Sequence, residues 1–256
     1  MKVRLPTTLK VAYSLTMISK LYSLLFETKP SYEENLATLL DLVAKCEENS
    51  LIVASEVCLT GYDWENFETM LAFASQALPK LLQATQNKTL IFTILERDGD
   101  GAKNYAYVMH NGKIIHRQAK AKLFKFGDEH HYLDAGDESD IVLFELDGIK
   151  LGVLICFELR FKSLWQQLEG ADIIAVPSWW GILREQNYKI LTTALAIMNQ
   201  CYVVCSDAQN AECTRASGVI TPFGKEFRNE GEKILSLDFS KKEIQKMRRY
   251  MDVGIK

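Results

Sequence analysis

Hydrophobic residues recur along the chain with two spacings, and each spacing predicts a different kind of element. After Ser31, apolar residues at 36, 39, 40, 43 and 46 follow the spacing of one helix face. Short runs rich in Val, Ile, Leu, Phe and Tyr, bounded by turn residues, predict strands instead. Strands are predicted at 9–15, 51–54, 89–95, 105–110, 113–116, 141–146, 149–155, 173–176, 202–204, 219–220 and 234–237. Helices are predicted from Ser31, at 161–168, at 184–199 and from Ser240.

Local turn and cap sequences support these elements. Asn111-Gly112 and Asp147-Gly148 each lie between two β-type runs, and residues that tolerate positive φ predict tight hairpins there. Ser31 with Glu34, and Ser240 with Glu243, have the spacing of capping boxes that begin helices. Strands, hairpins and helices mixed in this order predict an α/β protein with layers around a mixed sheet. Without a linker, a repeat or a low-complexity segment, the chain is predicted to be a single domain over residues 1–256.

Composition restricts the partners of this domain. Hydrophobic residues make up 48% of the 256 residues and charged residues 25%, which is enough apolar material for a sizeable core. The formal net charge of -3 provides no overall basic field for nucleic acid. The basic residues of 241–249 are predicted to form the exposed face of the last helix. No nucleic-acid partner is therefore expected.

The N-terminus and the cysteines bear on the cellular compartment. Lys2 and Arg4 precede an apolar stretch at 11–26 that resembles a signal peptide, but Lys20 interrupts it and no small-x-small cleavage site follows. No apolar run approaches the roughly 20 residues that span a bilayer. None of the six cysteines forms a Cys-x-x-Cys pair, so zinc and dithiol signatures are missing. The sequence predicts a cytoplasmic protein with reduced thiols and no membrane contact.

Cys156 is the first candidate for chemistry. It follows the apolar run 151–155 and precedes a predicted helix, which places it at a strand-to-helix turn. Sites in α/β sheets gather at the carboxyl ends of strands, and such a turn directs backbone N–H groups toward the thiol. A buried core cysteine remains the alternative interpretation.

Glu56 and Lys120 are two further candidates. Glu56 ends the apolar run 51–55, where burial would raise the pKa of a carboxyl group and suit it to a role as general base. Lys120 lies just past the Asn111-Gly112 hairpin, in a stretch with Arg117 and Lys122. Taken singly, each residue is more often a charge in solvent.

Taken together, four segments resemble the nitrilase superfamily of carbon–nitrogen hydrolases. Residues 55–62 (SEVCLTGY) are similar to its P-E-x-x-x-x-G-Y segment, and 120–124 (KAKLF) to its K-x-x-L segment. Residues 151–161 (LGVLICFELRF) are close to G-V-x-I-C-Y-D-L-R-F, and 126–136 (FGDEHHYLDAG) match a segment that carries a further glutamate. The segments stand in the family's order. The resemblance covers about residues 10–252 and implies a four-layer α-β-β-α sandwich with two mixed β-sheets.

The resemblance also implies a mechanism. Glu56 would take the thiol proton as Cys156 attacks the carbonyl carbon of a small amide, with water completing hydrolysis of the thioester. Lys120 and the Phe157 backbone N–H would stabilise the oxyanion, and Glu129 would hold Lys120. Neither a metal nor an organic cofactor is implied. The products would be ammonia and a carboxylic acid.

The resemblance gives less detail about the substrate and about the oligomeric state. Residues 157–161 are most similar to the ω-amidase and Nit-type branch, whose short substrates carry a carboxylate. Candidate substrate-binding residues are Tyr62, Arg160, Trp179 and Trp180, although Arg160 could instead form a structural ion pair and the tryptophans an aromatic pair at an interface. Open alternatives are an N-carbamoyl amidohydrolase, a nitrilase, an inactive binding or scaffold relative, and a thiol redox or metal protein. A homodimer or larger homo-oligomer is expected by resemblance.

Several positions depart from the family's pattern. Ser55 and Lys125 replace prolines, Glu158 stands where aspartate is common, and 11–14 lack the usual glutamine. In the segment that resembles an R-A-x-E-N helix, Leu195 and Met198 replace the two charged residues. Because they stand at i and i+3, they are interpreted as an apolar pair on one helix face, with an altered dimer contact as the alternative.

Overall fold

The computed structural model describes residues 18–229 and 231–255. The strand predicted at 9–15, with the departure at 11–14, lies outside these residues. Two six-stranded sheets form the centre of the molecule. The first sheet has the order β12-β1-β2-β3-β4-β5, and the second has the order β11-β10-β9-β8-β7-β6.

Each sheet mixes parallel and antiparallel strands. The first contains β1 (Lys20–Leu24), β2 (Ser50–Val53), β3 (Lys88–Asp98), β4 (Gly101–His110), β5 (Lys113–Ala119) and β12 (Ile234–Asp238). The second contains β6 (Phe144–Leu146), β7 (Ile149–Val153), β8 (Ile173–Pro177), β9 (Tyr202–Ser206), β10 (Gly218–Ile220) and β11 (Glu226–Arg228). β1, β2 and β3 are parallel, as are β7, β8 and β9, and the remaining pairs are antiparallel. The predicted mixed sheets are confirmed.

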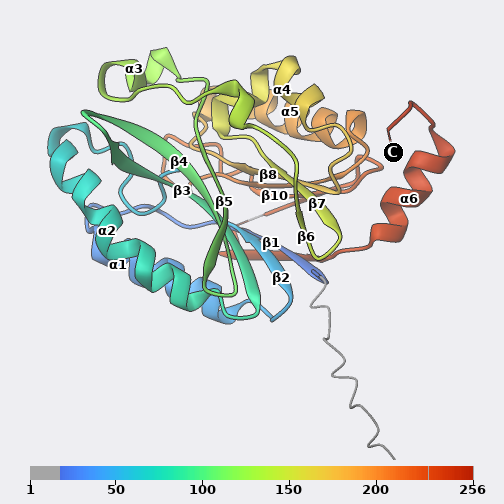
Figure 1. Ribbon diagram of the computed structural model, residues 1–256, viewed down its shortest axis with the longest axis horizontal. Coiled ribbons are helices and arrows are strands. Elements are labelled where there is room, and N and C mark those ends of the chain that lie inside the picture. The colour runs from blue at the N-terminus through green and yellow to red at the C-terminus, as the bar shows by residue number, and fades with distance from the viewer. Residues whose placement is uncertain (1–17, 230, 256) are drawn as a thin grey trace, which may run out of the picture.

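Helices cover the outer faces of both sheets (Figure 1). α1 (Tyr32–Lys45) and α2 (Phe67–Ala84) lie on the first sheet, and α4 (Lys162–Gln167) and α5 (Glu185–Met198) lie on the second. α3 (Glu129–Tyr132) is short, and α6 (Lys241–Tyr250) packs Ile244 and Met247 inward near the C-terminus. The inner faces of the sheets share one apolar core, in which Val53 and Ile91 meet Val153. The four-layer α-β-β-α sandwich is therefore confirmed.

The hairpin predictions are confirmed, but of the two predicted capping boxes only one bond, at Ser31, is found among the described residues. Asn111 and Gly112 have φ of 48° and 71°, as a tight turn between β4 and β5 requires. The Ser31 hydroxyl accepts a hydrogen bond from the Glu34 N–H at 3.3 Å. The Ser240 side chain makes no such bond, so α6 begins there without the predicted capping box. Burial of its apolar face fixes α6 instead.

Several elements differ from the sequence prediction. α2 was not predicted, because Pro79 in its interior lacks the N–H that an α-helix uses and argues against a helix. β1 lies inside the apolar stretch that was interpreted only as a segment resembling a signal peptide. β11 was too short to detect, and β6 begins three residues later than predicted. None of the described helices is both long and apolar enough to cross a membrane.

The structure separates Leu195 from Met198. Leu195 is fully buried in the core beneath α5, as an apolar replacement should be, whereas Met198 is 64% exposed. Interpreting the two as one packed apolar pair is therefore wrong, because the last turn of α5 turns Met198 toward solvent. Met198 is left free for contacts outside this chain.

Candidate active site

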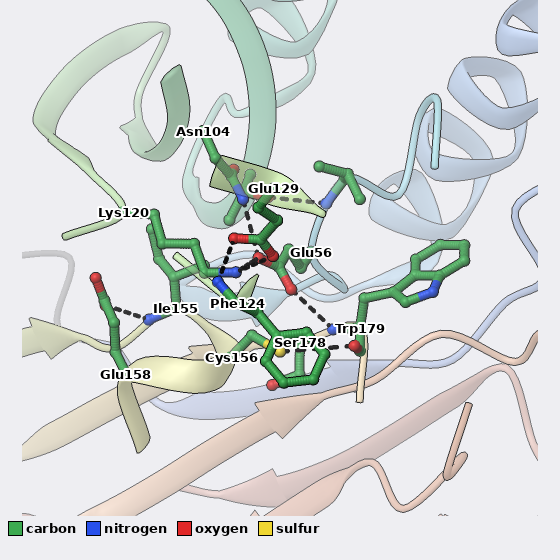
Figure 2. Close-up of polar contacts among 12 residues, drawn as sticks. Glu56, Asn104, Lys120, Phe124, Glu129, Ile155, Cys156, Glu158, Ser178 and Trp179 are labelled. Carbon is green, nitrogen blue, oxygen red and sulfur yellow. Dashed lines mark hydrogen bonds and ion pairs between the residues drawn. The ribbon is translucent and has the colours of Figure 1, made fainter. Parts of the chain in front are cut away.

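The candidate residues stand just past the carboxyl ends of strands. Glu56 follows β2, Lys120 follows β5, and Cys156 follows β7. β2 and β5 belong to one sheet and β7 to the other, so packing of the two sheets brings these three ends together. Figure 2 shows their side chains directed toward one spot, with Glu129 joining them from α3.

Lys120 is the centre of this arrangement. Its side chain is fully buried, and its Nζ lies 2.7 Å from Glu56 Oε1 and 2.7 Å from Glu129 Oε1. Burial alone would lower the pKa of the ammonium, but the charges of Glu56 and Glu129 outweigh burial and raise it. Lys120 therefore stays protonated and faces two carboxylates inside the protein.

The two oxygens of Glu56 have different surroundings. Oε1 accepts from the Lys120 ammonium and from the Asn104 side-chain amide, the latter at 2.9 Å. Oε2 accepts the Trp179 N–H at 3.0 Å, and the described hydrogen bond of the ammonium to Glu56 goes to Oε1 rather than to Oε2. Because Oε2 has only a neutral donor, it is the oxygen with capacity left to accept a proton.

Cys156 also contacts the backbone of Trp179. Its thiol donates to the Trp179 carbonyl oxygen at 3.6 Å, so Glu56 and Cys156 both contact the backbone of Trp179 (Figure 2). Burial and the nearby negative charge of Glu56 raise the pKa of the thiol, although Lys120 acts in the opposite direction. The resting thiol is therefore protonated and needs a base before it can attack a carbon atom.

Glu129 and Tyr62 complete the polar network. Glu129 Oε2 accepts the Phe124 N–H at 2.9 Å, and Tyr62 donates its hydroxyl to Glu129 Oε1 at 2.9 Å. Burial raises the pKa of the Glu129 carboxyl group, while the adjacent Lys120 opposes the increase. Tyr62, a candidate for substrate binding, thus lies within the network that holds Lys120.

A small cavity opens onto Cys156. Trp179, Trp180 and Arg160, all named from the sequence, line it. The rest of its lining comes from Phe124, Phe157, Gly181 and Arg184.

The Phe157 backbone N–H is free to receive a substrate atom. Phe157 is the second residue of the helical turn Cys156–Arg160, and the first N–H groups of a helix have no partner within it. Among the described residues, no hydrogen bond donated by this N–H is found. The position predicted for an oxyanion contact therefore holds an available donor.

Two arginines lie at the cavity without an acidic partner. Arg160 donates to the Asn187 side chain at 2.9 Å, and its guanidinium lies 5.1 Å from the Trp180 ring. The Arg184 guanidinium lies 5.2 Å from the Phe124 ring. Neither arginine forms a salt bridge within the described part of the chain, so the structural ion pair considered for Arg160 is not found.

Sequence reasoning missed three residues of this region. Asn104 binds Glu56, Arg184 lines the cavity, and the buried Asp207 accepts the Trp180 N–H at 2.7 Å. Only Asn104 had a local signal, as a polar residue next to the apolar run 105–110. The roles of Arg184 and Asp207 depend on contacts between distant segments, for which the linear sequence contains no signal.

Comparisons with known proteins place the sequence and the fold among known relatives. Residues 21–240 match the carbon–nitrogen hydrolase family. The chain is 31% identical over 186 residues to a 2-oxoglutaramate amidase of Bacillus subtilis, covering 68% of this chain and 71% of that protein. It is 30% identical over 213 residues to a deaminated glutathione amidase of Escherichia coli O157:H7, covering 78% and 81%. The fold matches Nit3 of Saccharomyces cerevisiae, a nitrilase superfamily member, with a TM-score of 0.80, 23% identity and coverage of 92% and 95%.

Proposed function

The chain belongs to the carbon–nitrogen hydrolase family, and on that premise we propose that it is an amidase in which Cys156, Glu56 and Lys120 hydrolyse a small amide. One observation carries the assignment of these residues. A thiol, a carboxylate with one oxygen not bound to the ammonium, and a buried ammonium converge beside a small cavity. These are the groups that acyl transfer to sulfur requires: a nucleophile, a base and a stabiliser of negative charge.

The first half of the reaction forms a thioester. Glu56 Oε2 takes the Cys156 proton while sulfur bonds to the amide carbon, and the carbonyl oxygen becomes an oxyanion. The Lys120 ammonium and the Phe157 N–H stabilise this oxyanion, and losing one such donor typically costs about a hundredfold to a thousandfold in rate. The proton on Glu56 then passes to the departing nitrogen, and the C–N bond breaks to release ammonia.

The second half uses the same carboxylate again. Glu56 removes a proton from water as the water oxygen attacks the thioester carbon. The tetrahedral species collapses, the C–S bond breaks, and the proton returns to sulfur. Glu129 contributes by position and charge, because its Oε1 lies 2.7 Å from Lys120 Nζ, as Glu56 Oε1 does. Two carboxylates keep the buried ammonium protonated through both steps.

Ammonia release from a panel of short amides tests this function. Wild-type protein should release ammonia, and Cys156→Ala should release none while its circular dichroism spectrum stays unchanged. N-carbamoyl compounds and nitriles belong in the same panel, since the same side chains serve those reactions. Undiminished turnover by Cys156→Ala would remove Cys156 from the mechanism, and an inactive wild type across the panel would favour a binding role.

The arginines at the cavity support a narrower substrate class. We propose that the substrate carries a carboxylate at the end opposite its amide, within reach of Arg160 and Arg184. Both guanidinium groups lie against aromatic rings and lack an acidic partner among the described residues, so their charge is available. The name of the Bacillus relative, a 2-oxoglutaramate amidase, is consistent with an acidic amide.

A matched pair of amides tests this class. Succinamate should be hydrolysed with a kcat/KM higher than that of butyramide by about tenfold to a hundredfold, because a hydrogen bond to a charged group contributes about 1.5–3 kcal/mol. Arg160→Gln and Arg184→Gln should reduce this preference, with Lys162→Gln on the exposed surface as the control. Equal kcat/KM for the two amides would refute the carboxylate site.

We further propose that two copies of the chain associate through α5. Leu183, in the helical turn before α5, and Ile190 and Ile197, in α5, follow one another at seven-residue spacing and are 93%, 56% and 42% exposed. An apolar stripe of this kind marks an interaction surface, and Met198 extends it at one end. Light scattering should find a dimer or larger assembly for the wild type and a monomer for Leu183→Glu/Ile190→Glu. A monomeric wild type would refute the proposal.

We also propose that the enzyme works in the cytoplasm. All six cysteines are free and buried in the structure, which suits a reducing compartment. Fractionation of the source cells should place the activity in the cytoplasmic fraction. Activity in a secreted or membrane fraction would contradict this proposal.

A further inference from the structure

Glu158 is a buried carboxylate that the reaction above does not use. We propose that it is a positioning residue, which sets the location of Cys156 relative to Lys120 by bridging the segments that carry them. The proposal rests on the amidase function, because it assigns Glu158 to the same two groups. The hydrogen bonds of Glu158 connect the ends of two strands, β5 and β7.

Both oxygens of Glu158 accept backbone N–H groups next to the reacting side chains. Oε2 accepts the Ile155 N–H at 2.7 Å, and Ile155 directly precedes Cys156 (Figure 2). Oε1 accepts the Ala121 N–H at 2.7 Å, and Ala121 directly follows Lys120. A single fully buried carboxylate thus holds one peptide adjacent to the nucleophile and one adjacent to the ammonium.

This bridge crosses between the two sheets. Lys120 follows β5, the edge strand of the first sheet, and Cys156 follows β7 of the second, so no backbone ladder connects them. The other polar link here is the buried Gln118 side chain, whose amide donates to the Val153 carbonyl at 3.2 Å. Since apolar packing between sheets has little directional preference, these directed bonds set the relative position of the two strand ends.

The burial of a carboxylate at position 158 is explained by such a bridge. The described salt bridges give it no cationic partner, and a buried carboxylate without one is costly. Burial raises the pKa of Glu158 to about 7, and the two backbone N–H groups and Lys120 oppose the increase. An uncharged glutamine has only one oxygen for the two N–H groups, so a carboxylate alone satisfies both.

A purely local role is the main alternative. Glu158 is the third residue of the turn Cys156–Arg160, and its bond to the Ile155 N–H has the geometry of a helix cap. Such a cap would stabilise the turn without requiring the Ala121 bond. The two roles differ in their effect on chemistry, because only the bridge connects the turn to Lys120.

Glu158→Gln tests the bridge through two measurements. Its kcat for the best amide should fall by about tenfold to a hundredfold, since a misplacement of about 1 Å costs on that order, with KM changed by less than about threefold. Alkylation of Cys156 by iodoacetamide should also slow by about fivefold or more at pH 8. Glu158→Asp, which keeps the charge and both acceptors, should recover most of both rates. A kcat within about twofold of wild type in folded Glu158→Gln would overturn the proposal.

Controls separate this result from instability and from failure of the amidase function. Ile244→Ala removes a buried side chain of α6 far from the site and should leave kcat unchanged despite lower stability. Alkylation needs no amide, so it tests the bridge even if the wild type hydrolyses none, with Cys156→Ala as background. Should Glu158→Gln not fold, Gln118→Leu removes the parallel link: a fall in kcat supports the proposal, and an unchanged kcat overturns it.

Discussion

Removing the buried ammonium should destabilise the protein by an amount that depends on pH. Lys120→Met leaves Glu56 and Glu129, which are 0% and 3% exposed, without their shared cation. Asn104 and the Trp179 N–H still donate to Glu56, so the loss is mainly electrostatic. Breaking a buried ion pair by removing one partner costs about 3–5 kcal/mol. This is a large part of the about 5–15 kcal/mol that stabilises a typical domain.

The sign of the pH dependence follows from the pKa of Glu129. Burial already raises it, and the loss of Lys120 removes the charge that opposes this increase. A carboxyl group whose pKa is higher in the folded state than in the unfolded state binds protons on folding. Stability is then greatest at low pH and is lost as pH rises through the folded-state pKa. The deficit of Lys120→Met relative to wild type should therefore be largest at pH 8 and should shrink toward pH 5.

A triple variant isolates the charge from the packing. Glu56→Gln/Lys120→Met/Glu129→Gln removes all three charges, and replacing a whole buried ionic cluster is often neutral or stabilising. Urea unfolding followed by tryptophan fluorescence at pH 5.5 and pH 8 gives the free energies, with the m value as a check on the unfolded state. The reasoning is refuted if Lys120→Met lies within about 1 kcal/mol of wild type at pH 8, or if the triple variant is the less stable of the two.

Two further predictions concern stability alone. Burial raises the pKa of Glu158 to about 7 from an ordinary value of 4.5, so the stability of wild type relative to Glu158→Gln should fall by about 3 kcal/mol between pH 4 and pH 8. A difference that does not change with pH in urea titrations would contradict that pKa. Cys156 has a φ of 46°, where a side chain costs about 1–2 kcal/mol and glycine does not, so Cys156→Gly should melt at a higher temperature than Cys156→Ala. A lower melting temperature for the glycine variant in calorimetry would show that the turn is not strained.

The parts of the fold that could be predicted depend on neighbouring residues. Asn111-Gly112 predicts the β4–β5 hairpin because the two residues alone provide the positive φ values of the turn. The Ser31 cap and the apolar face of α1 likewise depend only on residues that are close in the sequence. α2 was missed because Pro79 opposes a helix locally, while burial of Met70 and Leu81 against the first sheet outweighs that preference.

The candidate site could be predicted only where a residue belongs to a recognisable segment. Glu56, Lys120 and Cys156 each stand at the end of an apolar run, and ends of strands in packed sheets meet at one edge. Asp207 stands at the end of β9 in the same way, but nothing in its neighbours indicates that its carboxylate accepts the Trp180 N–H. Its contact joins two strand ends, and such a pairing exists only once the sheet has formed.

Unfavourable backbone conformations occur at and beside the candidate residues. Among the described residues, nine residues other than glycine have positive φ, and seven of them are Asn, Asp, Gln or Arg. The two exceptions are Val57, next to Glu56, and Cys156 itself, with φ of 43° and 46°. A β-branched residue is rarely found in this region, where strain costs on the order of 1–3 kcal/mol.

The surroundings hold Val57 in its unfavourable conformation. Its N–H donates to the Thr93 hydroxyl at 2.8 Å, and its carbonyl accepts the Gly61 N–H at 2.7 Å. Asp128, with a φ of 61°, directly precedes Glu129 in the same way. Each carboxylate that contacts Lys120, and the thiol, thus has a left-handed residue at or beside it. Since a regular strand would direct successive side chains to opposite faces, the turns after β2 and β7 allow Glu56 and Cys156 to converge.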